Sequence, residues 1–144
     1  MSETTTTIAS ASEFVEMLND DDFAVSQGTR YCEAPEEVWF EIIALHPESK
    51  ENVVDNKTVP LSVLEVLSRD SDSRIRWGVA TKRKLSVPLM NALAKDADAS
   101  VRKRIACNGS ATREVLEGLL LDEDEDIASR VKERLENGDF KNAR

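Results

Sequence analysis

The fold is decided by three consecutive stretches that align without a gap, PLSVLEVLSRDSDSRIRWGVATKRKL (60–85), SVPLMNALAKDADASVRKRIACNGSA (86–111) and TREVLEGLLLDEDEDIASRVKERL (112–135). Positions 26 residues apart keep their chemical character, as in the link aspartates Asp70, Asp96 and Asp122 and the apolar residues Ile75, Val101 and Ile127. A repeat of this length is typical of helical units that must stack to bury their apolar faces. The stretch therefore predicts an all-α fold of stacked repeats.

Each stretch predicts two helices joined by an aspartate-rich link. Apolar residues at helical spacing, as in Val63–Leu67, indicate the first helix. The link carboxylates are suited to cap the N–H groups that open the second helix. Ile75 and Val79, one turn apart, indicate the buried face of that short helix.

The chain outside these repeats is less regular. Residues 1–11 are rich in Ser and Thr and predict a disordered tail. Residues 12–59 predict a degenerate capping part, and regular repeats cover 60–135. We therefore expect a single helical-repeat domain over 12–138, followed by a frayed tail at 139–144.

Within the capping part, Ser12 is the N-cap expected for a first short helix. Phe23 and Val25 are expected to continue the packing after that helix ends. Ala34-Pro35-Glu36-Glu37 opens a stronger helix, because Pro and carboxylates suit a first turn.

Charge is distributed unevenly along the 144 residues, whose net charge is −9. Residues 1–68 carry 3 Lys/Arg and 14 Asp/Glu, for a net charge of −11. Residues 69–113 are basic, with a net charge of +7, and residues 114–144 return to −5. The acidic total argues against general affinity for nucleic acid or anionic membranes.

Compartment and cofactors are inferred from what the sequence contains. The N-terminal residues lack the basic and apolar regions of a signal peptide, and no apolar run approaches the ~18 residues of a membrane span. We expect a cytoplasmic protein with no membrane partner. Two cysteines, Cys32 and Cys107, are too few for a disulfide framework or a closed metal site, so reduced thiols and no metal are expected.

The segments LEVLSRDSDSRIRWGVA (64–80) and NALAKDADASVRKRIACN (91–108) resemble leucine-rich repeat variant units, which are relatives of HEAT and armadillo repeats. The family pattern is a Leu-x-x-Leu helix, a tight Asp turn, Val-Arg, Val-Ala and an Asn-containing loop. Ile75-Arg76 and Val101-Arg102 match the Val-Arg step, whereas Ile127-Ala128 lacks the Arg and the turns lack Pro.

The resemblance implies a short right-handed α-superhelix, here with a period of 26 residues. Some proteins of this kind carry an N-terminal cysteine cluster for iron and sulfur. Only Cys32 is present in that part of this chain, so no such cofactor is expected.

Trp77 is the residue that most clearly breaks the repeat. Its corresponding residues, Lys103 and Ser129, are polar, so a regular stack would place Trp77 toward solvent as a binding anchor. The alternative is that it covers apolar surface of the irregular first repeat.

The basic segment offers further candidates for partner binding in Arg76, Arg83 and Arg102. Arg76 and Arg102 could contact an acidic ligand, or they could bridge carboxylates such as Asp70 or Asp96 within the stack. Arg83 belongs to Lys82-Arg83-Lys84, which recurs as Arg102-Lys103-Arg104. Stacking could align these groups into a phosphate-binding ridge, or they could be an ordinary solvated face.

Acidic residues of the first 50 form a second group of candidates: Asp20, Asp21, Asp22, Glu33, Glu36 and Glu37. They could attract a basic partner, because opposite charge speeds association. The alternative is that they serve helix ends and turns.

Catalysis is not expected. His46 is the sole histidine, and no nucleophile elbow or phosphate loop accompanies it. The sequence favours a non-catalytic protein-binding module. Its size, charge and architecture resemble immunity proteins that neutralise nuclease toxins of contact-dependent growth inhibition systems, which implies occlusion of a basic toxin domain. The alternatives are nucleic-acid binding through residues 69–113 and a generic interaction scaffold.

Overall fold

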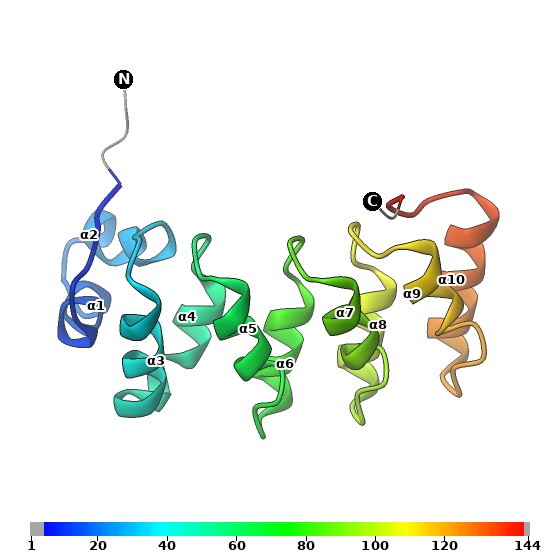
Figure 1. Cartoon of the computed structure of the whole chain (residues 1–144), viewed down its shortest axis with the longest axis horizontal. Coiled ribbons are helices and arrows are strands. Elements are labelled where there is room, and N and C mark those ends of the chain that lie inside the picture. The colour runs from blue at the N-terminus through cyan, green and yellow to red at the C-terminus, as the bar shows by residue number, and fades with distance from the viewer. Residues whose placement is uncertain (1–4, 143–144) are drawn as a thin grey trace. The chain divides into compact units, whose positions relative to one another are not determined.

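The computed structural model describes residues 5–142, and within that range the chain forms ten α-helices and two short 3-10 helices (Figure 1). The described residues contain no strand beyond two isolated bridges. The all-α prediction is confirmed. The chain divides into two compact units, one ending at Val66 and one beginning at Leu67, where the sequence predicts one domain over 12–138. The division falls in the last turn of α5 (Leu61–Leu67).

The N-terminal unit is built around helices α1 and α3. Its elements before α5 are α1 (Ala11–Leu18), α2 (Phe23–Gln27), η1 (Gly28–Arg30), α3 (Glu36–Leu45), η2 (Pro47–Ser49) and α4 (Lys50–Asp55). α1 packs on α3, and the rings of Phe14 and Trp39 meet edge to face with centroids 5.7 Å apart. Both side chains are fully buried, so this aromatic pair is the centre of the unit's core.

Residues 6–10, which fall within the predicted disordered tail over 1–11, are held by hydrogen bonds. Ile8 N–H donates to Glu33 O, and Glu33 N–H donates to Thr6 O, both at 2.8 Å. Ile8 is buried, and Ser10, rather than Ser12, caps α1 by accepting from Glu13 N–H. The buried Ile8 and these backbone hydrogen bonds thus fix residues 6–8 against the unit, and residues 1–4 of the predicted tail lie outside the described range.

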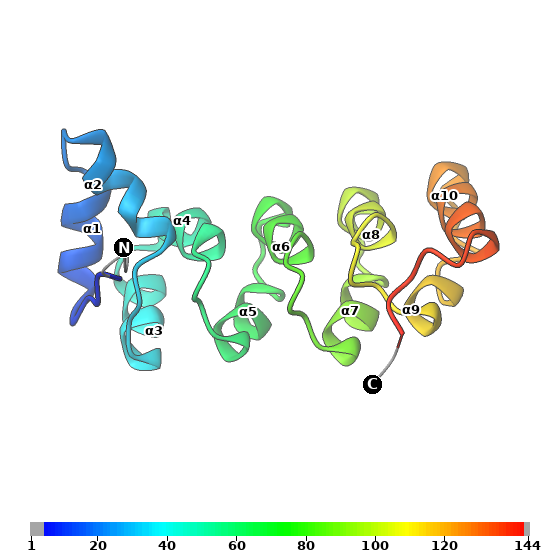
Figure 2. The same cartoon turned by 90° about the horizontal axis from the view of Figure 1, so that it is seen from above.

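The C-terminal unit contains helices in two layers. They are α6 (Ser73–Ala80), α7 (Val87–Leu93), α8 (Ala99–Ala106), α9 (Arg113–Glu117) and α10 (Glu125–Glu136). Figure 2 shows α6, α8 and α10 side by side in one layer and α7 and α9 in the other. Val79, Ile105 and Val131 are fully buried from the first layer, as their spacing predicts.

The aspartate links cap the second helices as predicted. Asp72, Asp98 and Asp124 are the N-caps of α6, α8 and α10, and each accepts from the N–H two residues ahead. The first aspartate of each link accepts in turn from the N–H of the cap at 2.9 Å. Each link is therefore a local hydrogen-bonded unit that starts the next helix.

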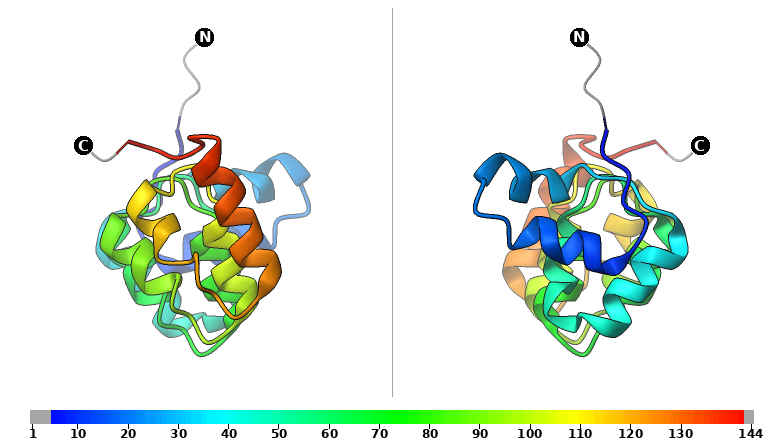
Figure 3. Two further views of the ribbon diagram at one scale, coloured as in Figure 1. Left: turned by 90° about the vertical axis from the view of Figure 1, so that its right-hand side faces the viewer. Right: turned by 90° about the vertical axis from the view of Figure 1, so that its left-hand side faces the viewer.

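The end of the chain folds back on this unit after α10 (Figure 3, left). Gly138 has a φ of +67°, which suits a residue without a Cβ and ends the helix. Lys141 N–H then donates to Ala111 O at 3.0 Å, and Lys141 forms a bridge with Thr112. Residues 139–141 of the predicted frayed tail are thus held by hydrogen bonds, and residues 143–144 lie outside the described range.

A helix that crosses a membrane must be long and apolar. In the described part of the chain, every helix is too short or too polar to cross a bilayer.

Candidate functional site

Residues 20–33, here named the acidic–aromatic segment, expose apolar side chains among carboxylates. Asp20 and Asp22 open α2, and Asp22 caps it by accepting from Ala24 N–H at 2.9 Å. No residue of α2 is buried, and the Phe23 side chain is 76% exposed. Tyr31, after η1, is 60% exposed. The expectation that Phe23 and Val25 continue the core is wrong, because both project from a short helix that leaves its apolar side chains in solvent.

Buried polar contacts hold the C-terminal half of this segment in place. The Asn56 side-chain amide, itself fully buried, donates to Thr29 O at 2.8 Å and to Cys32 O at 2.9 Å. Lys57 N–H donates to Arg30 O, and Thr58 Oγ1 donates to Cys32 O. Tyr31 is therefore displayed from a fixed loop, which lowers the entropy that binding would cost.

The predicted acidic residues lie on the surface of the same unit. Asp21, Glu33, Glu36 and Glu37 are exposed, and the last two occupy the first turn of α3. Asp22 is exposed but also serves as the α2 cap, so its carboxylate has the structural role of the alternative interpretation as well. All five acidic residues belong to the N-terminal unit, whereas the basic candidates belong to the C-terminal unit.

Arg76 and Arg102 form two equivalent clamps inside the C-terminal unit. Arg76 donates through Nε and Nη2 to Asp96, at 2.8 and 3.1 Å, and through Nη1 to Asp70 O. Arg102 makes the same bonds to the Asp122 carboxylate and to Asp96 O. These are the bridges of the structural alternative, and they engage the donors of both guanidinium groups.

The clamps shift the pKa values of a carboxylate and an arginine that form them. Burial alone would raise the pKa of Asp122, but hydrogen bonds from Arg102 and from the Asp124 N–H outweigh it and lower that pKa. The hydrogen bond with Asp96 raises the pKa of Arg76. Each effect favours the charged form of the residue concerned.

Trp77 and Arg83 are the predicted residues of the C-terminal unit that remain on its surface. Trp77, on α6, is 45% exposed, in contrast to the fully buried Trp39. Arg83 is exposed in the turn that follows α6. The alternative of a phosphate-binding ridge meets an interruption at α8, because Arg102 is buried, Arg104 half-buried and Lys103 exposed.

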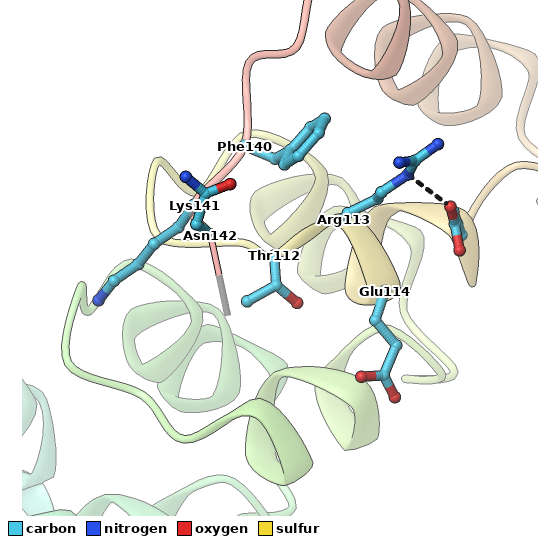
Figure 4. Close-up of a pocket in the computed structure, with 7 residues that line it drawn as sticks. Thr112, Arg113, Glu114, Phe140, Lys141 and Asn142 are labelled. Atoms are coloured by element: carbon cyan, nitrogen blue, oxygen red, sulfur yellow. Dashed lines mark hydrogen bonds and ion pairs between the residues drawn. The ribbon is translucent and has the colours of Figure 1, made fainter. Parts of the chain in front are cut away.

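A shallow pocket of about 400 Å³ lies where the C-terminal residues meet the start of α9 (Figure 4). Its walls include Thr112, Phe140 and Lys141. Arg113 pairs with Glu117 at 2.9 Å and lies 5.9 Å from the Phe140 ring centroid. The Thr112 hydroxyl accepts from Val115 N–H as the N-cap of α9.

Sequence reasoning missed Phe23 and Tyr31 as surface residues. The available signal was Asp20-Asp21-Asp22 directly before Phe23, since a helix opened by three carboxylates has little apolar sequence with which to bury an aromatic ring. No family model, curated protein or solved structure matches the chain.

Within residues 5–142, no cluster of three or more His, Cys, Asp or Glu side chains has the arrangement of a metal site. Cys32 and Cys107 are free thiols, and burial raises the pKa of Cys32 to about 11. The features that stand out are therefore the acidic–aromatic segment and the exposed Trp77.

Proposed function

We propose that this protein is a non-catalytic binding module whose acidic–aromatic segment binds one basic protein. The observation that carries the proposal is Phe23, 76% exposed directly after three aspartates. Aromatic anchors ringed by polar groups dominate the energetics of many protein interfaces, and complementary charge speeds encounter. The remainder of the chain is proposed to be the scaffold, a right-handed superhelix of HEAT-like or leucine-rich-variant repeats with a period of 26 residues.

The specific form of this proposal is an immunity protein. In that form, the acidic–aromatic segment covers the basic groove of a nuclease toxin and excludes its substrate. An interface of standard size buries about 1,600 Å² in total, which is more than this segment offers alone. Glu36 and Glu37, exposed at the start of α3 in the same unit, would extend the acidic surface.

The arginine clamps favour a protein partner over nucleic acid. The phosphate ridge would run through Lys82-Arg83-Lys84 and Arg102-Lys103-Arg104, but Asp122 already neutralises Arg102. Asp96 likewise neutralises Arg76, a further candidate of residues 69–113. Trp77 is also the only aromatic residue in that segment, whereas single-stranded nucleic acid is commonly held by several stacked rings.

The test is affinity purification from the cells that make the protein, comparing wild type with Phe23→Ala/Tyr31→Ala. We expect wild type to retain one basic protein at equal stoichiometry and the variant to lose it, with no change in thermal unfolding because both side chains are exposed. Leu45→Ala, a substitution at a 65% exposed residue of the same unit, is the matched control. Stoichiometric nucleic acid without a protein would refute the proposal.

A further inference from the structure

We propose that the outer face of the α6–α8–α10 layer docks an acidic segment of another polypeptide, anchored on Trp77 and held by Lys103, Arg104 and Arg130. This surface, here named the basic face, lies entirely in the C-terminal unit. It is opposite in charge to the acidic–aromatic segment, and it does not rest on the function proposed for that segment.

The packing of the layer places these residues together. α8 packs against both α6 and α10, and equivalent arginine clamps join α6 to the link before α8 and α8 to the link before α10. Residues 26 apart therefore occupy corresponding positions on neighbouring helices. One row of the outer face is Trp77, Lys103 and Ser129, and the next is Gly78, Arg104 and Arg130.

The cations of the basic face are available to a ligand. Lys103 and Arg130 are exposed, and Arg104 is half-buried. Among residues 5–142, no ion pair joins these three side chains to a carboxylate, in contrast to the clamped Arg102. The Nε atom of Arg104 is buried without a hydrogen-bond partner, so this donor is unmet in the free protein.

Three carboxylates limit the face on α10, and the first is Glu125, exposed four residues before Ser129. Asp126 and Glu133 are exposed four residues before and three residues after Arg130, so they share its side of the helix. They would repel an acidic ligand from the ends of α10. The ligand is therefore expected to lie across α8, between Trp77 and Arg130.

The composition of the face favours a polypeptide. Tryptophan and arginine are the residues most enriched at the energetic centres of protein interfaces. Binding to nucleic acid would need more phosphate contacts than three cations supply and more than one ring for stacking. In a carboxylate-rich segment, the carboxylates would pair with the three cations and one apolar side chain would pack on the Trp77 ring.

The test uses the full chain and a fluorescein-labelled peptide of Asp and Glu residues with one central Leu, at low salt. Fluorescence anisotropy is expected to show saturable binding, accompanied by a shift in Trp emission. Trp39 is fully buried and contributes a constant background, so the shift reports Trp77. The shift should vanish in Trp77→Phe.

Charge reversal supplies the controls. Lys103→Glu/Arg130→Glu should weaken peptide binding at least ~10-fold, because like charge then opposes the ligand. Lys132→Glu should not, since Lys132 is exposed on α10 at the position where the other two helices carry the buried Ala80 and Ala106. Phe23→Ala/Tyr31→Ala should bind the peptide as wild type does, which separates this proposal from the proposed function.

Three results would overturn the proposal. The first is no saturable binding of the peptide, and the second is an equal loss of binding in Lys132→Glu. The third is tighter binding of a single-stranded oligonucleotide that Lys103→Glu/Arg130→Glu abolishes, because the face would then be a phosphate site.

Discussion

At the residue scale, the frame depends on a few buried polar side chains, namely two asparagines that follow helices and one arginine within α10. Asn56 and Asn108 each bridge carbonyl groups 24–28 residues earlier in the chain. Arg134, 3% exposed, does the same by donating to Ala106 O and Asn108 O. A loop asparagine ordinarily faces solvent, so composition alone could not identify these bridges.

Asn108→Ala should destabilise the protein by about 3 kcal/mol, because it leaves the carbonyls of Ala80 and Lys82 and the N–H of Ser110 without their partner. Urea denaturation measures the change. Asn142→Ala, at an exposed position, should shift stability by less than about 0.5 kcal/mol. If the two variants had equal free energies of unfolding, the Asn108 hydrogen bonds would not contribute to the stability of the fold.

The two cysteines should differ in reactivity with iodoacetamide at pH 8. Cys32 is fully buried and its pKa is raised to about 11, so its thiol stays protonated and shielded. Cys107 is half-buried and should react first. Mass spectrometry of the native protein should find Cys107 labelled and Cys32 unlabelled until urea is added, and labelling of Cys32 at the same rate would contradict the packing around it.

At the element scale, the regular half of the chain could be predicted well because its signals are local. An Asp at the start of a helix and apolar residues one turn apart act within a few residues of sequence, and α6, α8 and α10 begin where those signals place them. The exposure of Phe23 on α2 was signalled only by the three aspartates before it, because the burial of a ring also depends on packing by residues distant in the sequence. Such packing also decides the burial of Ile8, which requires Glu33 as a backbone partner.

The Arg102–Asp122 clamp should make stability sensitive to acid. The folded-state pKa of Asp122 is lowered, so its ion pair stabilises the fold above the unfolded pKa, near 3.8, and this contribution is lost as pH falls through the folded value. At pH 7, Asp122→Asn should lower the free energy of unfolding by about 2 kcal/mol. Below pH 4, the free energies of unfolding of this variant and of wild type should become more similar.

Urea unfolding at pH 7 and pH 3 measures this narrowing. Asp21→Asn, at an exposed acid of the N-terminal unit, is the control and should follow wild type at both values. A difference between Asp122→Asn and wild type that stays constant with pH would show that charge is not what the clamp contributes.

At the scale of the whole molecule, charge is divided between two compact units. Acidic residues dominate the first unit. In the second unit, two of the basic residues, Arg76 and Arg102, are paired with carboxylates in the clamps. Charge counts along the sequence predicted this division, but they could not tell the engaged Arg102 from the available Lys103, because adjacent residues of one helix point in different directions. The acidic–aromatic segment and the basic face are therefore proposed to serve different partners.

The central claim, that the acidic–aromatic segment is where a basic protein binds, is tested most directly by a photo-crosslinking residue placed at position 23 in the producing cells, with position 45 as control. Both side chains are well exposed in the N-terminal unit, at 76% and 65%, but only Phe23 follows the three aspartates. The account predicts one crosslinked basic protein from position 23 and none from position 45. The same protein crosslinked only from position 45, or crosslinks from position 23 to nucleic acid alone, would contradict it.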